Sequence, residues 1–298
     1  MVNHKSTHVK RVKKGADEVS VNIIVNVVAL VFALVCFFPM LRVFSQAISG
    51  DAYVMSGQIV LFPKGITLKH LEYVFSSASF MSGMYLSIAS TVVYTVLALV
   101  LTVLLAYPLS RSYLKGRKQL NFFVVFTMLF NGGIIPTYLV VRMLGLTNSF
   151  MALIIPQAIS AYNTIVLITA FRAIPKDFEE AAKVDGAGNF RILFQIMLPM
   201  AKPTVMVLLL WYAVFRWNSW FDAMMYITDT KLRVLPLIIR NIINQGNSAL
   251  ANMVRTNPSP TVAVQSASVL IAVLPILVLY PFLQKYFVKG VMIGGVKG

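Results

Sequence analysis

Acidic side chains are scarce in this chain, and their positions argue against one class of transport mechanism. The 298 residues include 10 Asp and Glu against 26 Lys and Arg. None of the acidic residues lies within a long apolar run, and Asp222 comes nearest, at the end of one. Proton-driven membrane pumps use ionisable side chains inside the bilayer as relays. The sequence therefore disfavours a proton-driven pump, while coupling to sodium through backbone carbonyl groups at a broken helix stays open.

Further absences narrow the chemistry that this chain can perform by itself. The sequence has no G-x-x-x-x-G-K-[ST] phosphate loop, so if ATP supplies the energy, another chain has to bind it. The single cysteine, Cys36, excludes a disulfide within the chain and a CxxC metal site. The histidines are scattered, and no Ser/His/Asp set lies near the membrane plane. We therefore expect no catalytic residues, no metal site and no cofactor bound by this chain.

The scarcity of charged residues and the long apolar runs together indicate a membrane protein. Apolar residues make up 58% of the positions and charged residues 12%, whereas a soluble domain carries about 25% charged residues. Six apolar runs are long enough to cross a hydrocarbon core of about 30 Å as helices. They predict an all-α polytopic membrane protein with six transmembrane helices: Val21–Phe44, Met84–Leu109, Leu120–Val141, Phe150–Phe171, Val205–Phe221 and Val264–Phe287.

Lysine and arginine predict the orientation, because they are enriched in cytoplasmic loops. They gather in both tails, after the second run and between the fourth and fifth runs, which puts both termini in the cytoplasm. This topology accounts for the net charge of +16 without a nucleic-acid partner. The first run is too long for a signal peptide, so we expect an uncleaved span. The predicted organisation is a basic cytoplasmic tail (1–20), a first transmembrane helix (21–48), a five-helix core (84–288) with a cytoplasmic loop (173–203) and an external loop (222–263), and a cytoplasmic C-terminal tail (289–298).

The loop 173–203 contains a polar segment, EEAAKVDGAGNFRILFQIMLP, from Glu179 to Pro199. Asp177 and Glu180 resemble a capping box at a helix start, and Glu179 and Lys183 are spaced for an i,i+4 ion pair. One face of this first helix is expected to carry Phe178, Ala181, Ala182 and Asp185, and one face of a second helix Phe190, Leu193, Phe194 and Met197. The pattern predicts two short helices joined by a glycine turn. They form either a knob that fits a cleft on a soluble partner or an amphipathic hairpin on the lipid surface.

The same segment carries a known signature. Glu180-Ala181-Ala182, Gly186 and Ile196-x-Leu198-Pro199 match EAA-x3-G-x9-I-x-LP at every position. The segment thus resembles the EAA loop of bacterial ABC importer permeases, in which the loop is a coupling helix seated in a groove of the ATPase. The resemblance implies that Glu180 pairs with a basic residue of the ATPase and that Gly186 permits close approach. The implied coupling residues are Glu180, Ala181, Ala182, Asp185, Gly186, Ile196, Leu198 and Pro199.

Other stretches resemble the branch of this family that imports oligosaccharides released from polysaccharides, including the second permease of maltose-type systems. They are the segment 130–138 (FNGGIIPTY), Trp217-Asn218-x-Trp220, and the tail motifs 287–290 and 295–298. The resemblance implies a type I ABC importer permease fold in a bacterial plasma membrane, working by alternating access. It also implies a second homologous permease subunit, two ATPase subunits that bind ATP and Mg, and an extracellular or lipid-anchored substrate-binding protein. The alternative is a stand-alone secondary transporter or channel for a polar solute.

Polar and aromatic side chains in the spans are candidates for a substrate path. Two polar stripes either line a passage for a hydroxyl-rich solute or join helices. They are Ser87, Ser90, Thr91, Tyr94 and Thr95 on the second span, and Gln157, Ser160 and Thr164, with Asn163 nearby, on the fourth. The glycines at 132 and 133 either pack closely against another helix, which we expect, or unwind toward substrate. Arg216 either binds an acidic sugar or extends to the headgroups, and we expect the second. The complete set of candidates is Tyr94, Asn131, Gly132, Gly133, Gln157, Asn163, Trp211, Arg216, Trp217 and Asn218.

Overall fold

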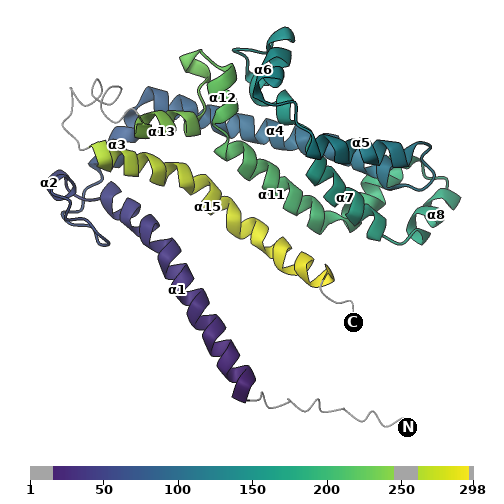
Figure 1. Ribbon diagram of the computed structural model, residues 1–298, viewed down its shortest axis with the longest axis horizontal. Coiled ribbons are helices and arrows are strands. Elements are labelled where there is room, and N and C mark those ends of the chain that lie inside the picture. Colours follow the sequence, from purple (N-terminus) through teal and green to yellow (C-terminus); the bar gives the residue numbers. More distant parts are fainter. Residues whose placement is uncertain (1–15, 245–260, 295–298) are drawn as a thin grey trace.

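The computed structural model describes residues 16–244 and 261–294, and all regular elements in these ranges are helices (Figure 1). Most of the predicted basic tail, the middle of the predicted external loop (residues 245–260) and the last four residues, with the second tail motif, lie outside the described residues. The observed all-helical architecture agrees with the predicted fold class.

Three long helices set the frame of the molecule: α1 (Ala16–Ala47), α4 (Ala78–Ser110) and α15 (Thr261–Gly294). α4 packs against α7 (Ala161–Ala173) and α11 (Lys202–Asn218), and α15 packs against α1, α11 and the short α3 (Lys69–Ser76). In Figure 1, α8 (Asp177–Val184) lies at one end of the molecule, which we call the α8 end. The short helices α2 (Asp51–Met55) and α13 (Leu235–Asn244) lie at the opposite end, which we call the α13 end.

Several predicted spans are bent rather than continuous. The third span is split into α5 (Arg117–Leu129) and α6 (Ile134–Met143), which meet at 113°. The fourth consists of the short helices η1 (Phe150–Leu153) and η2 (Ile155–Gln157) followed by α7 at 53°. Within the described ranges, two helices are long and apolar enough to cross a membrane, or up to five when each bent pair counts as one span. This count differs from the six predicted transmembrane helices, while the predicted all-α polytopic fold class is confirmed.

The break in the third span has a local cause. Residues 130–133 are not helical, and Gly133 has a φ of +88°, a backbone conformation that residues with a side chain avoid. The expectation that the glycines serve close packing is not met within the described chain. A Cβ added at Gly133 would meet nothing within 4 Å, and one at Gly132 would meet only Pro136 Cβ at 3.8 Å. The stretch is an unwound corner.

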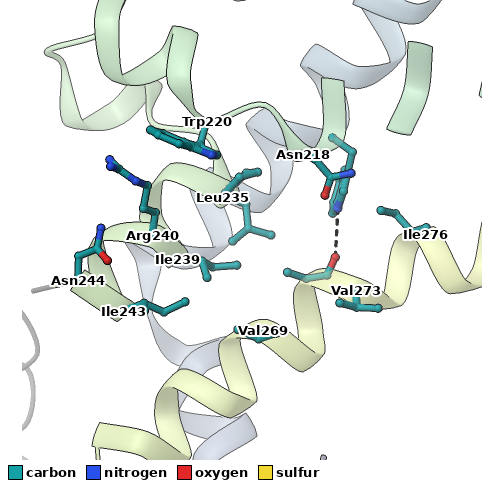
Figure 2. Close-up of a pocket in the computed structure, with 13 residues that line it drawn as sticks. Asn218, Trp220, Leu235, Ile239, Arg240, Ile243, Asn244, Val269, Val273 and Ile276 are labelled. Atoms are coloured by element: carbon teal, nitrogen blue, oxygen red, sulfur yellow. Dashed lines mark hydrogen bonds between the residues drawn. The ribbon is translucent and has the colours of Figure 1, made fainter. Parts of the chain in front are cut away.

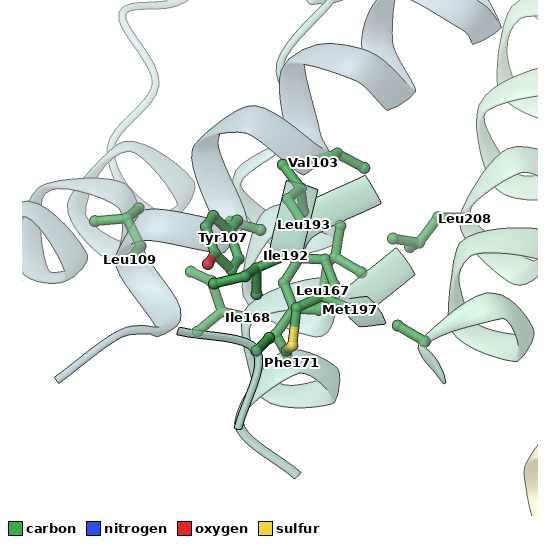
Figure 3. Close-up of a cluster of buried hydrophobic side chains, with 13 residues drawn as sticks. Val103, Tyr107, Leu109, Leu167, Ile168, Phe171, Ile192, Leu193, Met197 and Leu208 are labelled. Carbon is green, nitrogen blue, oxygen red and sulfur yellow. The ribbon is translucent and has the colours of Figure 1, made fainter. Parts of the chain in front are cut away.

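A buried apolar cluster ties the loop 173–203 to the spans (Figure 3). Val103 and Leu109 of α4, Leu167 and Phe171 of α7, and Leu208 of α11 surround side chains from α9 (Asn189–Ile192) and the π-helix η3 (Leu193–Met197). The buried loop side chains are Ile192, Leu193 and Met197. These residues are as deeply buried as the span residues around them. The loop 173–203 is therefore packed against the spans at the α8 end.

Candidate functional site

The loop 173–203 folds as two short helices joined by a tight turn, which confirms the predicted arrangement. α8 ends at Val184, and Gly186 follows with a φ of +75° and donates its backbone N–H to Lys183 O at 3.0 Å. α9, η3 and α10 (Leu198–Met200) then lead into α11 through an 85° bend. A glycine is needed at this turn because a side chain would strain the left-handed backbone conformation.

One detail of the predicted hairpin was wrong. Lys176 precedes α8 as its N-cap and no side chain caps the helix, so Asp177 and Glu180 do not form a capping box. Asp177 instead lies in the first turn, where its charge favours the helix dipole. Of the four residues expected to share one face of α8, only Ala182 is buried, and it is joined by Glu179.

In the second helix of the hairpin, the face that packs against the spans differs from the predicted face. Leu193 and Met197 are buried as expected, but Phe190 is 71% and Phe194 54% exposed. Ile192 is buried and Ile196 half-buried, so the packed face lies on the 192/196 side of Leu193 and Met197 rather than on the 190/194 side. The side chain of Ile192 therefore packs against the spans, and Phe190 and Phe194 form part of an exposed apolar surface on the hairpin.

The predicted coupling residues divide between an exposed set and a packed set. Glu180, Ala181, Asp185, Gly186 and Pro199 are exposed at the surface. Ala182 is buried, and Ile196 and Leu198 are half-buried against the cluster of Figure 3. The exposed set is available to another chain, while the packed set fixes the hairpin on α4, α7 and α11.

Beneath the exposed set lies a buried ion-pair network centred on Glu179. Arg111, the residue that ends α4, forms a salt bridge from Nη1 to Glu179 Oε2, and its Nη2 donates to Phe171 O at 3.0 Å. Lys183 Nζ donates to Glu179 Oε1 at 2.8 Å, which confirms the predicted i,i+4 pair. Burial by itself would raise the pKa of Glu179, but the hydrogen bonds from Lys183 and Arg111 outweigh it and hold the pKa below its ordinary value.

Sequence reasoning missed the role of Arg111. It counted this residue only as one of the basic charges that set the topology. Its partner Glu179 is 68 residues away in the sequence, so no local spacing links the two. The available signal was the position of Arg111 directly after an apolar run, ahead of the other basic residues of its loop, and this position does not identify a partner.

A second site is a cavity of about 620 Å³ among α4, the corner 130–133, η2, α7 and α11. It gathers Tyr94, Asn131, Gly132, Gln157, Asn163 and Trp211 from the predicted substrate path, and it is also lined by Thr127, Phe130, Pro156, Ile159, Ser160, Tyr212 and Phe215. None of these lining side chains is charged. The cavity therefore offers amide and hydroxyl groups together with aromatic rings, which suits a neutral, hydroxyl-rich part of a ligand.

Several contacts fix the geometry of this cavity. Tyr94 donates its hydroxyl to Gln157 O at 2.8 Å and meets the ring of Tyr212 edge-on, with centroids 6.0 Å apart. Asn131 Oδ1 accepts the N–H of Gly133 at 2.9 Å, which stabilises the unwound corner. Trp211 lies beside Tyr162, with ring centroids 5.7 Å apart. Thus α4, the third span and α11 each present a positioned polar or aromatic group to the cavity.

Of the polar stripe on α4, Ser87 serves to join elements rather than to line the cavity. It accepts the backbone N–H of Leu235 at 2.8 Å and is buried, as Ser90 is.

The remaining predicted path residues do not line this cavity. Arg216 is only 3% exposed, forms a salt bridge with Asp222 and donates to Leu153 O at 2.9 Å, so the expectation that it extends to the headgroups was wrong. Trp217 is buried, with its Nε1 donating to Ala272 O at 3.1 Å. Asn218 lines a separate cavity of about 360 Å³ near Trp220 and Arg240 (Figure 2). Gly133 belongs to the unwound corner but not to the lining.

The described residues hold no group of three His, Cys, Asp or Glu side chains placed to bind a metal ion. The two sites described above consist of ion pairs, hydrogen bonds and aromatic contacts.

Comparison with known proteins defines the class. The chain belongs to the family of binding-protein-dependent transport system inner membrane components, whose profile matches residues 80–293. The predicted class, a permease of an ABC importer, is thereby confirmed. The chain is 39% identical over 274 residues to the polygalacturonan/rhamnogalacturonan transport system permease protein YtcP of Bacillus subtilis (strain 168), covering 90% of this chain and 95% of that one. It is also 39% identical to Protein LplC of the same organism over 271 residues, covering 89% and 90% of the two chains.

Solved structures agree with this assignment. A chain of a bacterial ABC transporter involved in the import of the acidic polysaccharide alginate superposes with a TM-score of 0.87 at 32% identity, covering 93% of this chain and all of that one. A chain from the alginate transporter in complex with its pentasaccharide-bound periplasmic protein matches with a TM-score of 0.58 at 18% identity, which shows a common fold.

Proposed function

We propose that this chain is the transmembrane permease subunit of an ATP-driven importer for oligosaccharides derived from polysaccharides. A binding protein outside the membrane delivers the sugar, a second homologous permease completes the path, and two ATPase subunits bind ATP and Mg. Both termini face the cytoplasm, in a bacterial plasma membrane. The observation that carries the proposal is the construction of the molecule: the helices α4, α7 and α11 hold the polar cavity and also hold the hairpin 173–203.

The surface of the hairpin supports docking on an ATPase. Glu180 is exposed next to a cavity of about 420 Å³, and large apolar side chains surround it on the hairpin. Val184 is 87% exposed, and Phe178 and Phe190 are exposed as well. A mixed surface of exposed carboxylates and apolar side chains suits a protein cleft better than a lipid surface, where acidic groups are disfavoured beside anionic headgroups.

The polar cavity supports a sugar as the solute. Amide groups of Asn131, Gln157 and Asn163 supply hydrogen bonds for hydroxyl groups, and Trp211 supplies an apolar ring face. Two of the proteins named above belong to transport systems for polygalacturonan and rhamnogalacturonan and for alginate, which are polysaccharides. Because the lining of this chain is uncharged and Arg216 is already paired with Asp222, we propose that this subunit contacts the hydroxyl groups of the sugar and not an acidic group.

Reconstitution tests the proposal. Proteoliposomes should take up oligosaccharide only when this chain is combined with its partner permease, the ATPases, the binding protein and ATP. The chain alone should move no sugar, and gradient-driven uptake by the isolated chain would contradict the proposal. In the complete complex, Glu180→Lys should weaken ATPase association and abolish uptake, because it reverses the charge of the exposed coupling residue. Uptake at the wild-type rate in this variant would refute the coupling role of Glu180.

A further inference from the structure

Three elements of the fold meet at the carboxylate of Glu179. α8 supplies the carboxylate itself, and the end of α4 supplies Arg111. The last turn of α7 takes part through Phe171 O, which accepts from the same guanidinium at 3.0 Å. Arg111 also donates from Nε to Ser110 Oγ at 2.9 Å, so all three of its nitrogens are engaged.

The surroundings of the Arg111–Glu179 ion pair make its separation unfavourable. The side chains of Arg111 and Glu179 are each only 7% exposed, at the wall of the cavity of about 420 Å³ that Glu180 also lines. Lys183 closes the remaining side of the carboxylate and lies over the ring of Tyr113, with its Nζ 4.4 Å from the ring centroid. A buried charge pair of this kind resists separation, because separation would leave an uncompensated charge in the interior. The neighbouring Glu180 is exposed.

α4 and α7, the two helices that the Arg111–Glu179 pair connects to α8, are also linked to each other at the cavity of about 620 Å³. Tyr94 of α4 donates to Gln157 O, just before α7, and Asn163 of α7 lines the same cavity. Tyr94 lies 16 residues before Ser110 on one continuous helix, about 24 Å away at 1.5 Å per residue. A displacement of α8 thus reaches α4 and α7 together at one end and the lining of the cavity at the other.

We propose that Glu179 and Arg111 form the joint that transmits movement of the hairpin 173–203 to the cavity. They are positioning residues for transport: they contact neither sugar nor nucleotide, and they act by holding α8, α4 and α7 as one body. This role is distinct from the docking role of Glu180, since Glu180 faces outward and Glu179 faces the spans. The inference rests on the proposed function, because a joint of this kind matters only if the hairpin is driven by an ATPase.

The test uses the complete transporter in proteoliposomes and measures ATPase association, ATP hydrolysis and sugar uptake. Glu179→Gln keeps the shape of the side chain and removes its charge. It should leave the ATPases associated and hydrolysing ATP, while sugar uptake per ATP falls about 5- to 150-fold, the span of ordinary coupling free energies. Arg111→Lys keeps the positive charge but loses the planar guanidinium that contacts Glu179 and Phe171 O together. We expect a smaller fall in uptake per ATP from this variant.

Matched variants separate transmission from general damage. Asp177→Asn removes an exposed charge from the same helix and should keep the wild-type uptake per ATP. Glu179→Asp retains the carboxylate and should recover part of the uptake lost in Glu179→Gln. If Glu179→Gln fails to assemble, Arg111→Lys and Glu179→Asp carry the test.

The outcomes are distinguishable. Wild-type uptake per ATP in every assembled variant of the joint would overturn the inference and leave the proposed function intact. An equal fall of hydrolysis and uptake would also overturn it, because that result indicates lost structure rather than lost transmission. Failure of the wild-type complex to transport sugar with ATP would instead overturn the proposed function.

Discussion

Two buried arginine–carboxylate pairs occupy opposite parts of this molecule, and they differ in how completely they are satisfied. At the α8 end, every guanidinium nitrogen of Arg111 has a partner. Toward the α13 end, Arg216 pairs with Asp222 and with Leu153 O, but its Nε and Nη2 are buried without a partner in the described part of the chain. The first pair links residues 68 positions apart, and the second links residues 6 positions apart.

The difference shows what each pair can do. The Arg111–Glu179 pair crosses from a loop to two spans and leaves no guanidinium nitrogen of Arg111 without a partner, so it favours one geometry. The Arg216–Asp222 pair closes the local turn between α11 and α12 (Phe221–Tyr226), where Ser219 also hydrogen-bonds to Asp222. Unpaired buried nitrogens cost free energy, about 1–3 kcal/mol per group. The second pair is therefore the less complete of the two, and the following experiments test this contrast.

The largest effect is expected from Arg111→Met. This change leaves Glu179 buried with Lys183 as its only cationic partner, and breaking a buried pair typically costs about 3–5 kcal/mol. The midpoint of thermal unfolding of the detergent-solubilised chain should fall accordingly. Lys183→Met is the control, since Lys183 is 43% exposed and its loss should have a much smaller effect. An equal effect of the two substitutions would contradict the assignment of Arg111 as the main partner.

A somewhat smaller effect is expected from Asp222→Leu, which leaves Arg216 buried with Leu153 O as its remaining partner. We expect a loss of about 3 kcal/mol, the lower end of the range for a broken buried pair. The double variant Arg216→Met/Asp222→Leu should recover most of that loss, because no charge then stays buried. Chemical denaturation of the wild type, Asp222→Leu and the double variant measures the difference. A double variant as unstable as the single one would show that the pair itself is not the source of the effect.

A smaller effect is expected from Gly186→Ala, which tests whether the position of α8 depends on its turn as well as on Glu179. The φ of +75° at this residue costs a side-chain-bearing residue about 1–2 kcal/mol, although space for a Cβ is available. Thermal unfolding should show a modest loss of stability, and the matched change Gly188→Ala, at a negative φ of −73°, should show less. A larger loss at Gly188 would contradict the explanation.

The smallest effect is expected from pH, because burial opposes the lowering of the Glu179 pKa. A carboxyl group whose folded pKa lies below its unfolded value adds stability that is fully present above the unfolded value, about 4.3. That stability is lost as the pH falls through the folded pKa. Lowering the pH below about 4.3 should therefore destabilise the wild type more than Glu179→Gln. Identical curves of stability against pH for the two proteins would show that Glu179 does not contribute to the loss of stability at low pH.

The sequence predicted those features that depend on local pattern. The six apolar runs correspond to helical segments, and the signature from Glu180 to Pro199 lies on a two-helix hairpin as expected. The phenylalanines at 190 and 194 were placed wrongly because apolar residues flank Leu193 and Met197 on both sides, at 190/194 and at 192/196, and spacing does not show which side packs. Pairing of Arg111 with Glu179 was missed because it depends on how α4 and α8 pack and on no local spacing.

The candidate cavity shows the same division. Tyr94, Gln157, Asn163 and Trp211 were chosen as polar or aromatic residues within apolar runs, and the fold brings them together. Arg216 was chosen by the same rule but turns toward Asp222, which lies beyond the non-helical residue Ser219. The rule finds polar residues that must have a partner, whereas packing decides whether that partner is a cavity or another side chain. Their roles in transport stay predictions.

The corner at residues 130–133 has a consequence for assembly. Peptide groups that are not in a helix cannot be left against acyl chains, because hydrocarbon offers them no hydrogen bonds. This side of the chain must therefore be wetted or covered by another polypeptide wherever the corner lies at membrane depth. The non-helical backbone of this corner therefore keeps acyl chains away from one wall of the cavity, whichever side chains line that wall.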